Sequence, residues 1–179
     1  MVPRALIRRA TAGDVPAIVD LLHRAYEEYR DRLDPPSGAH RESRASVSDL
    51  RNREAALVAE QDRRIVGCVF YAFSEDDLGR VCYMHRLAVL PESRHQGLGS
   101  QLVLGAEAEA AQARVDRIDL GVRIPLVDNH RFYFALDYRI VDARAHEGYD
   151  LPTFYLMRKW RNGERRPLRT IRVVPHDPA

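Results

Sequence analysis

The stretch "RHQGLGSQL", residues 94–102, has the residue types of a loop that binds an anion through its backbone. Two glycines, Gly97 and Gly99, allow a tight turn, and a helical spacing begins near Leu98. The first amides of a helix have no partner within the helix and carry partial positive charge, so they can hold a phosphate group. Acidic residues usually occupy such a helix start, but the first carboxylate here is Glu107. These features predict a site for an external anion.

Two polar side chains add to this prediction, and the competing nucleotide motifs fit badly. Arg94 can pair with a phosphate oxygen, and Ser100 adds a hydroxyl. A dinucleotide fingerprint needs a third glycine where Leu102 stands, and a Walker loop needs a Gly-Lys pair, whereas Lys159 is the only lysine in the chain. Taken alone, the loop is equally typical of a glycine-containing turn between a strand and a helix that binds nothing.

The pattern of apolar residues predicts strands and helices on both sides of this loop. Alternating or continuous apolar runs indicate strands, and apolar residues at i, i+3, i+4 spacing indicate helices. The predicted strands are residues 4–11, 55–61, 64–73, 81–90, 117–122, 138–146 and 153–160. The predicted helices are residues 18–29, 43–53, 98–114 and 126–136. The Pro- and Gly-rich segment 31–40 and the polar segment 74–80 are expected to be loops.

The order of these elements predicts a mixed sheet. Strand, helix, strand, helix, strand between residues 81 and 146 implies parallel neighbours that are joined by crossover helices. Hairpins on either side of this segment imply antiparallel pairs.

Length and composition are those of one soluble domain. With 179 residues, of which 45% are hydrophobic and 30% charged, the chain can bury a sizeable core. No apolar run approaches the about 20 residues of a membrane span, and the first residues lack the apolar core of a secretory signal. The expected location is therefore the cytoplasm. We divide the chain into a domain at residues 1–160 and a basic tail at residues 161–179.

Neither the basic end of the chain nor its two cysteines indicates nucleic-acid or metal binding. From Arg158 onward there are seven Lys or Arg against two acids, but no aromatic residue beyond Trp160 is interleaved with them. A solvated end or a packing arm is favoured. Cys68 and Cys82 lie in apolar runs with no second ligand at metal spacing, which is typical of buried thiols.

Two motifs make the whole arrangement similar to a known family. Arg94, Gly97 and Gly99 fit the pattern Arg/Gln-x-x-Gly-x-Gly/Ala after the fourth strand. The segment "FYFALDY", residues 132–138, is similar to Phe/Leu-Tyr-x-x-Leu-Gly-Phe on the helix after the fifth strand. With the order of elements over residues 4–160, the chain resembles the GNAT superfamily of N-acetyltransferases. The resemblance implies an α/β fold of the α+β type, with a mixed, mostly antiparallel sheet of about seven strands, splayed between strands 4 and 5, and about four flanking helices.

Members of this family move an acetyl group from acetyl coenzyme A to an amine, usually by direct attack on the thioester. The resemblance implies that the loop amides hold the pyrophosphate and that the fourth strand pairs with the pantetheine arm. An amide of that strand, at Leu87 or Ala88, would stabilise oxygen charge in the tetrahedral intermediate. No metal is expected. The implied cofactor-binding residues are Leu87, Ala88, Val89, Arg94, His95, Gln96, Gly97, Leu98, Gly99 and Ser100, with Asn129 as a weak addition.

The resemblance also implies a base and an acid. Polyamine-type members carry a glutamate where this chain has His85, whose ordinary pKa of about 6.5 suits a base near neutral pH. The alternative is a hydrogen-bonded histidine that packs beside Tyr83. The tyrosine that protonates the leaving thiolate corresponds to Tyr133, with an ordinary pKa of about 10, and the alternative is a core tyrosine. Asp137 and Tyr138 replace the family's glycine and phenylalanine, so the turn after this helix can differ.

The acceptor is the least determined part of this interpretation. Family acceptor pockets use the first helix and its following loop, the region before the fourth strand, and the last hairpin. Acids and phenols in these segments, among them Tyr26, Tyr29 and Tyr149, would attract a cationic amine. The prediction is a primary amine of a small molecule or a peptide terminus, with no membrane or nucleic-acid partner, and a homodimer is left open. Two alternatives remain: acetylation of lysines or N-termini of a protein partner, and a non-catalytic acyl coenzyme A sensor.

Overall fold

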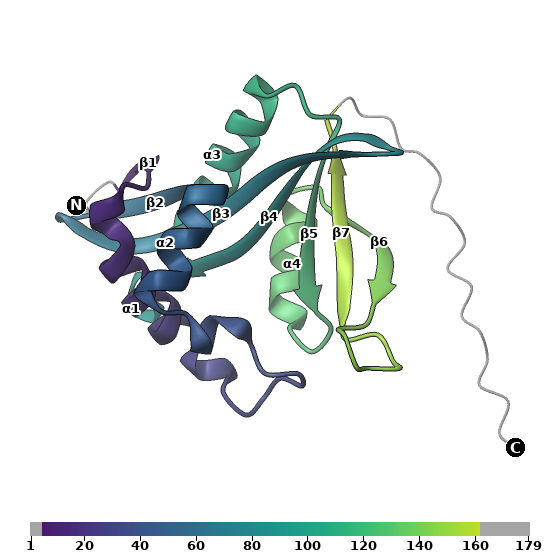
Figure 1. Cartoon of the computed structure of the whole chain (residues 1–179), viewed down its shortest axis with the longest axis horizontal. Coiled ribbons are helices and arrows are strands. Elements are labelled where there is room, and N and C mark those ends of the chain that lie inside the picture. Colours follow the sequence, from purple (N-terminus) through teal and green to yellow (C-terminus); the bar gives the residue numbers. More distant parts are fainter. Residues whose placement is uncertain (1–4, 162–179) are drawn as a thin grey trace, which may run out of the picture.

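The strands form one seven-stranded sheet. The computed structural model describes residues 5–161, and the strand order is β1-β2-β3-β4-β5-β7-β6 (Figure 1). Neighbouring strands are antiparallel except β4 and β5, which are parallel, so the expected mixed and mostly antiparallel sheet is confirmed. The strands are β1 (Leu6–Arg9), β2 (Ala55–Gln61), β3 (Arg64–Asp76), β4 (Gly79–Val89), β5 (Arg117–Arg123), β6 (Arg139–Arg144) and β7 (Phe154–Trp160).

Four α-helices flank the sheet, as expected. α1 and α2 pack together on one face, and α3 packs on the other (Figure 1). The first helix ends at Tyr26, three residues earlier than predicted, and a 3-10 turn follows. Near this end of the helix, the Ala25 carbonyl accepts a hydrogen bond from the Arg94 side chain. The helices are α1 (Val15–Tyr26), α2 (Arg44–Arg53), α3 (Leu98–Gln112) and α4 (Val127–Ala135).

The strands β4 and β5 separate part of the way along, which confirms the expected splay. They pair only from Val81 to Met84 on β4, opposite residues 117–120 on β5. Beyond that point β4 contains a bulge, because His85 pairs with Phe70 and Ala88 with Cys68, so two residues lie opposite one. A bulge bends its strand and increases the local twist. The bulge therefore leads the last part of β4 away from β5.

The expected polar loop at residues 74–80 is wrong. β3 continues to Asp76 and β4 begins at Gly79, so only a two-residue turn separates them. The guanidinium of Arg117 is 1% exposed and binds both the Asp76 carboxylate and the Gly79 carbonyl. A charged residue about 40 positions later therefore stabilises the end of this hairpin, and no local pattern could have shown it.

The expectation of parallel neighbours throughout residues 81–146 is also only partly right. β4 and β5 are parallel, but β6 does not lie beside β5, because β7 inserts between them and pairs antiparallel with both. β7 contributes the buried Leu156 and Met157, whereas β6 has no buried residue. The more apolar strand thus takes the interior position and β6 becomes the edge.

Further observations concern the cysteines, the helices and the metal-ligating side chains of the described residues. Cys68 and Cys82 are free and buried. None of the described helices has the length and apolarity that crossing a bilayer requires. Residues 5–161 contain no group of three or more His, Cys, Asp or Glu that could hold a metal ion. The predicted basic tail lies outside the described residues except for Arg161.

Candidate active site

The loop between β4 and α3 presents a run of amides that have no partner. Within residues 5–161, no backbone carbonyl accepts from the amides of His95, Gln96 or Gly97, and the first bond of the helix runs from Gln101 to the Gly97 carbonyl. His95 and Gly97 have φ of 60° and 76°, which turns successive amides toward one side. Such a concave row of N–H groups at a helix N-terminus is a binding site for anions. The geometry fits a phosphate or pyrophosphate group.

The Arg94 side chain anchors this loop. Its Nε donates to the Val89 carbonyl at 3.2 Å, and its Nη2 donates to the Ala25 carbonyl at 3.0 Å. Its Nη1 lies 2.6 Å from a carboxylate oxygen of Glu28. Because all three nitrogens already have partners in α1, β4 and the turn after α1, the backbone amides are the groups left to bind an anion.

The outer half of β4 has one open edge. Ala88 and Val89 pair with β3, but β5 has already separated from them. Leu87, in the bulge, accepts a hydrogen bond from the Tyr26 hydroxyl at 3.3 Å. An open strand edge can pair with an extended ligand that carries amide groups. This is the position that the family resemblance predicts for the pantetheine arm.

Tyr133 extends from α4 toward this opening. Burial raises the pKa of its hydroxyl well above the usual range, and the neighbouring phenols of Tyr26 and Tyr83 raise it further. The ring packs edge-on against Phe132 and Tyr138, with centroids 4.9 and 5.7 Å away. Tyr133 is therefore a neutral phenol whose ring is held in a fixed position.

His85 packs between two aromatic rings, and both of its ring nitrogens have partners. Its centroid lies 6.0 Å from Phe70 and 6.1 Å from Tyr83, so the expected packing beside Tyr83 is present. Arg86 Nη1 lies 2.7 Å from Nδ1, and a guanidinium can only donate. Nε2 must then carry the proton and donate to Glu54 at 2.5 Å. Burial lowers the pKa of His85 below its usual value, so the ring is neutral at neutral pH.

Glu54 is a site residue that sequence reasoning missed. It lies between α2 and β2, 31 residues before His85, and nothing in its local pattern marks it. Its Oε2 accepts from His85, whereas its Oε1 makes no hydrogen bond within the described range, and the side chain is 23% exposed. The free carboxylate oxygen can accept a proton. The orientation of the pair is maintained by Arg86, whose guanidinium also binds the buried Glu42.

The other predicted residues lie around the same opening. The rings of Tyr26 and Tyr29 pack edge-on at 5.8 Å. Burial raises the pKa of Tyr29, and the Asn129 side chain opposes this slightly, so Asn129 lies near the phenol at the start of α4. Tyr149 donates to Asp34, which joins the loop after β6 to the loop after α1.

The two departures from the expected second motif leave its turn intact. Asp137 adopts a left-handed conformation with φ of 68°, which is the conformation that a glycine would take there. Tyr138 is fully buried, and its hydroxyl donates to Glu107 at 3.0 Å. The turn after α4 is therefore closed by a non-glycine residue.

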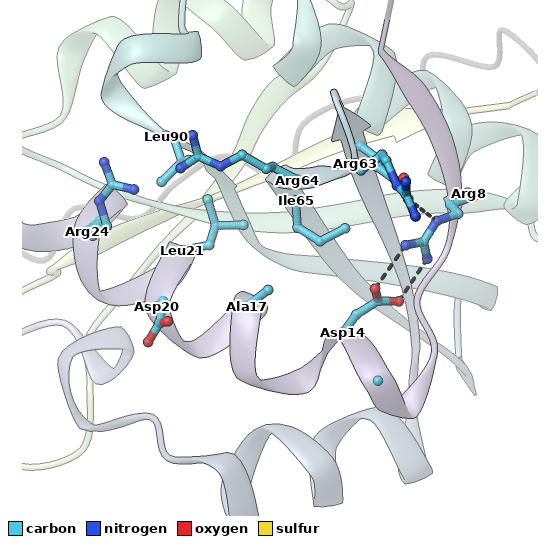
Figure 2. Close-up of a pocket in the computed structure, with 12 residues that line it drawn as sticks. Arg8, Asp14, Ala17, Asp20, Leu21, Arg24, Arg63, Arg64, Ile65 and Leu90 are labelled. Carbon is cyan, nitrogen blue, oxygen red and sulfur yellow. Dashed lines mark hydrogen bonds and ion pairs between the residues drawn. The ribbon is translucent and has the colours of Figure 1, made fainter.

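A separate cavity of about 530 Å³ lies on the α1 face (Figure 2). Charged side chains line it, among them Arg24 and Asp20 on α1 and Arg64 at the start of β3, and Arg8 binds both oxygens of Asp14 at its rim. None of the residues that surround the splay lines this cavity. The candidate site is the opening between β4 and β5.

Comparison with known proteins identifies the family of the chain. The model of the acetyltransferase (GNAT) family matches residues 15–138. A probable N-acetyltransferase 14 of Danio rerio is 40% identical over 89 residues, which are 49% of this chain and 31% of that protein. An aminoalkylphosphonate N-acetyltransferase of Salmonella typhimurium is 43% identical over 56 residues, which are 31% of this chain and 36% of that protein. The match thus spans about a third of the length of these curated relatives.

A solved structure shows the same fold. The PaiA N-acetyltransferase of Thermoplasma acidophilum, determined in complex with coenzyme A, has a TM-score of 0.70 and 16% identity. The likeness covers 88% of this chain and 99% of that one. Because the family model covers more than half of the sequence and the splayed sheet agrees with it, the chain belongs to the acetyltransferase (GNAT) family.

Proposed function

We propose that this protein transfers an acetyl group from acetyl coenzyme A to a primary amine. The observation that carries the proposal is the row of unpartnered amides at the start of α3, next to the open edge of β4. The amides suit a pyrophosphate and the edge suits the amide groups of a pantetheine arm. Both relatives are named as N-acetyltransferases, and one of them is named for amines that carry a phosphonate.

The proton of the acceptor passes to the pair formed by Glu54 and His85. An ammonium ion has no lone pair, so it must lose a proton before it can attack. His85 already directs its Nε2 proton at Glu54, which leaves Glu54 Oε1 as the acceptor of the proton. His85 orients this carboxylate and stabilises its charge, and it is itself held in one tautomer by Arg86.

The transfer then proceeds by direct attack. The amine lone pair forms the new C–N bond at the thioester carbonyl carbon, and the C–S bond breaks with its electron pair on sulfur. Tyr133 gives its phenolic proton to that sulfur, and the second proton released by the amine returns through water to Tyr133. The products are the N-acetyl amine and the free thiol of coenzyme A.

The test is free-thiol release by the purified full chain, with acetyl coenzyme A and a panel of primary amines. At least one amine should give release that is proportional to enzyme, together with an acetyl mass shift of the amine. Binding of acetyl coenzyme A without release for any amine would support the sensor instead. Release that appears only with lysate proteins, as single acetyl mass shifts, would assign the activity to a protein acceptor.

A further inference from the structure

Arg123, the last residue of β5, has one edge of its guanidinium without a partner. Its Nε and Nη2 atoms are shielded from solvent and make no hydrogen bond within residues 5–161. It is the one described arginine for which both atoms of this edge are buried and unpaired. The side chain remains a cation, because a guanidinium keeps its proton in proteins.

In other arginines of this molecule, the Nε and Nη2 edge of the guanidinium binds a carboxylate. Arg158 donates from Nε and Nη2 to the two oxygens of Asp119, both at 2.7 Å. Arg30 binds Glu27 in the same way, also at 2.7 Å. Two parallel N–H groups match the spacing of two oxygens on a carboxylate or a phosphonate. The edge of Arg123 is therefore suited to an anion that the chain itself does not supply.

The strand geometry places Arg123 beside the candidate site. β5 loses its pairing with β4 after Leu120, so residues 121–123 border the splay (Figure 1). Gly121 is one strand repeat before Arg123, a step of about 7 Å, and lies on the same side of the sheet. A Cβ at Gly121 would lie 3.2 Å from both the Tyr83 hydroxyl and the Phe154 ring. Arg123 thus follows Tyr83 along the face that also carries His85.

Two loops meet at Arg123. Asp34 and Tyr149 are bonded to each other there, and the charge of Asp34 opposes the lowering of the Arg123 pKa that burial causes. The guanidinium forms no ion pair with Asp34 within 4.0 Å. His146 lies close enough for the charge of Arg123 to lower its pKa, although burial has the larger effect. Asp34, Tyr149 and His146 are therefore neighbours of Arg123 that leave its Nε and Nη2 edge unoccupied.

We propose that Arg123 binds an anionic group of the acceptor, so that the substrate is a short amine that carries a carboxylate or a phosphonate. The inference rests on the proposed acetyl transfer. The anion would take the Nε and Nη2 edge of Arg123, and the amine would face Glu54 across the splay. A neutral alkylamine would lack the first of these contacts.

The experiment compares three amines at one pH with the full chain and acetyl coenzyme A. They are 2-aminoethylphosphonate, β-alanine and propylamine. At least one of the two anionic amines should exceed propylamine in kcat/KM by about 10- to 100-fold, the effect of a charge-assisted bidentate contact. The better of the two identifies phosphonate or carboxylate as the preferred anion. Equal values for all three amines would overturn the proposal.

Variants separate anion binding from a general loss of function. Arg123→Gln should lower kcat/KM for the preferred anionic amine by about 10- to 100-fold and leave propylamine unchanged. For the preferred anionic amine, the kcat/KM of Arg123→Lys should lie between those of wild type and Arg123→Gln. Lysine keeps the charge but lacks the two parallel N–H groups of the guanidinium. Arg44→Gln, an exposed arginine at the start of α2, should behave as wild type. Equal losses on all amines in Arg123→Gln would indicate a structural role and contradict the proposal.

A second measurement keeps the two proposals apart. If no amine releases thiol, the proposed transfer fails, and calorimetric titration of 2-aminoethylphosphonate and of β-alanine into the protein with coenzyme A still decides the role of Arg123. Binding that Arg123→Gln abolishes would support the anion site. Absence of binding for both probes, or equal binding to wild type and variant, would overturn it.

Discussion

At the residue scale, the chemistry depends on where each proton is held. Tyr133 is a neutral phenol because burial raises its pKa, and no hydrogen bond ties its hydroxyl to another residue in the range 5–161. A phenol in this state carries its proton at the start of the reaction and can donate it to the charge that develops on the leaving sulfur. The predicted role of Tyr133 as the acid therefore depends on its hydroxyl group alone.

Tyr133→Phe should lower kcat by about 10²-fold or more, because general acid catalysis contributes about 10²- to 10⁴-fold. The KM for acetyl coenzyme A should change little, since the ring and its contacts remain. Steady-state thiol release checks both values. Tyr155→Phe, a tyrosine that packs against His130 at 5.3 Å, serves as the control. Equal turnover in wild type and Tyr133→Phe would remove this residue from the mechanism.

The pair of His85 and Glu54 should determine the acidic limb of the pH profile. Because burial lowers the pKa of His85 below its usual value of about 6.5, the ring stays neutral until the pH falls below that value. On the acidic side of the profile, kcat/KM should therefore be constant above about pH 6.5 and decline only below that pH. The dependence of kcat/KM on pH measures this limb, and a midpoint above 6.5 would contradict the assignment.

Glu54→Gln should lower kcat by about 10²- to 10⁴-fold, since the amide keeps the shape but cannot accept the proton. Glu75→Gln, an exposed residue near the end of β3, is the matched control. His85→Ala should show a smaller loss with an altered acidic limb, because it removes only the group that orients Glu54. If His85→Ala keeps the wild-type rate and pH profile, the histidine has no part in the reaction.

At the element scale, α3 supplies the anion site through its first turn. Its buried residues Leu102, Val103 and Ala106 hold the helix against the sheet, so the amides ahead of it are fixed in direction. The left-handed backbone at Gly97 turns the preceding amides into the same concavity. A side chain at Gly97 should therefore disturb the direction of these amides.

Gly97→Val should weaken binding of coenzyme A by about tenfold or more, because a β-branched residue resists the φ of 76° and the amides lose their common direction. The cost to the fold should be about 1–2 kcal/mol, so the protein still folds. Calorimetric titration with coenzyme A and a thermal melt measure the two effects. Gly38→Ala is the control, since a Cβ there meets nothing within 4 Å. Unchanged affinity in Gly97→Val would exclude this loop as the anion site.

At the scale of the whole molecule, an ion-pair cluster joins the first strand to the first helix and to β2. Arg8 donates to both oxygens of Asp14 at 2.8 and 2.9 Å and to Glu60 at 2.7 Å. The hydrogen bond from Arg8 is the main reason why the pKa of Asp14 lies far below its usual value. Because the folded state binds this proton less tightly than the unfolded chain, the cluster stabilises the fold at neutral pH.

This stabilisation should be fully present above the unfolded pKa of about 3.9 and be lost as the pH falls through the lower folded pKa. Asp14→Asn should cost about 1–3 kcal/mol at pH 7, the range for a hydrogen bond to a charged group. The deficit relative to wild type should shrink as both proteins are brought to pH 3 and below. Urea unfolding at pH 7 and pH 3 measures it, with the exposed Asp20→Asn as the control. A deficit that stays the same at both pH values would contradict the linkage.

Local patterns in the sequence determined the elements and the anion loop. Alternation and helical spacing placed seven strands and four helices, since each depends on neighbours within a few residues. The glycines at 97 and 99 and the acid-free start of α3 predicted the loop for the same reason. The family resemblance predicted the splay between β4 and β5, and the pairing confirms it.

Only the tertiary structure decided the contacts between distant segments. Arg117 stabilises the hairpin that looked like a loop, β7 takes the place beside β5, and Glu54 joins His85 across 31 residues. The loops that meet at Arg123 are joined by residues 115 positions apart. Such contacts leave no local signature, because they depend on how the strands are ordered and where one of them bends. The sequence therefore predicted the anion loop, and the fold decided which charges are left free to meet an acceptor.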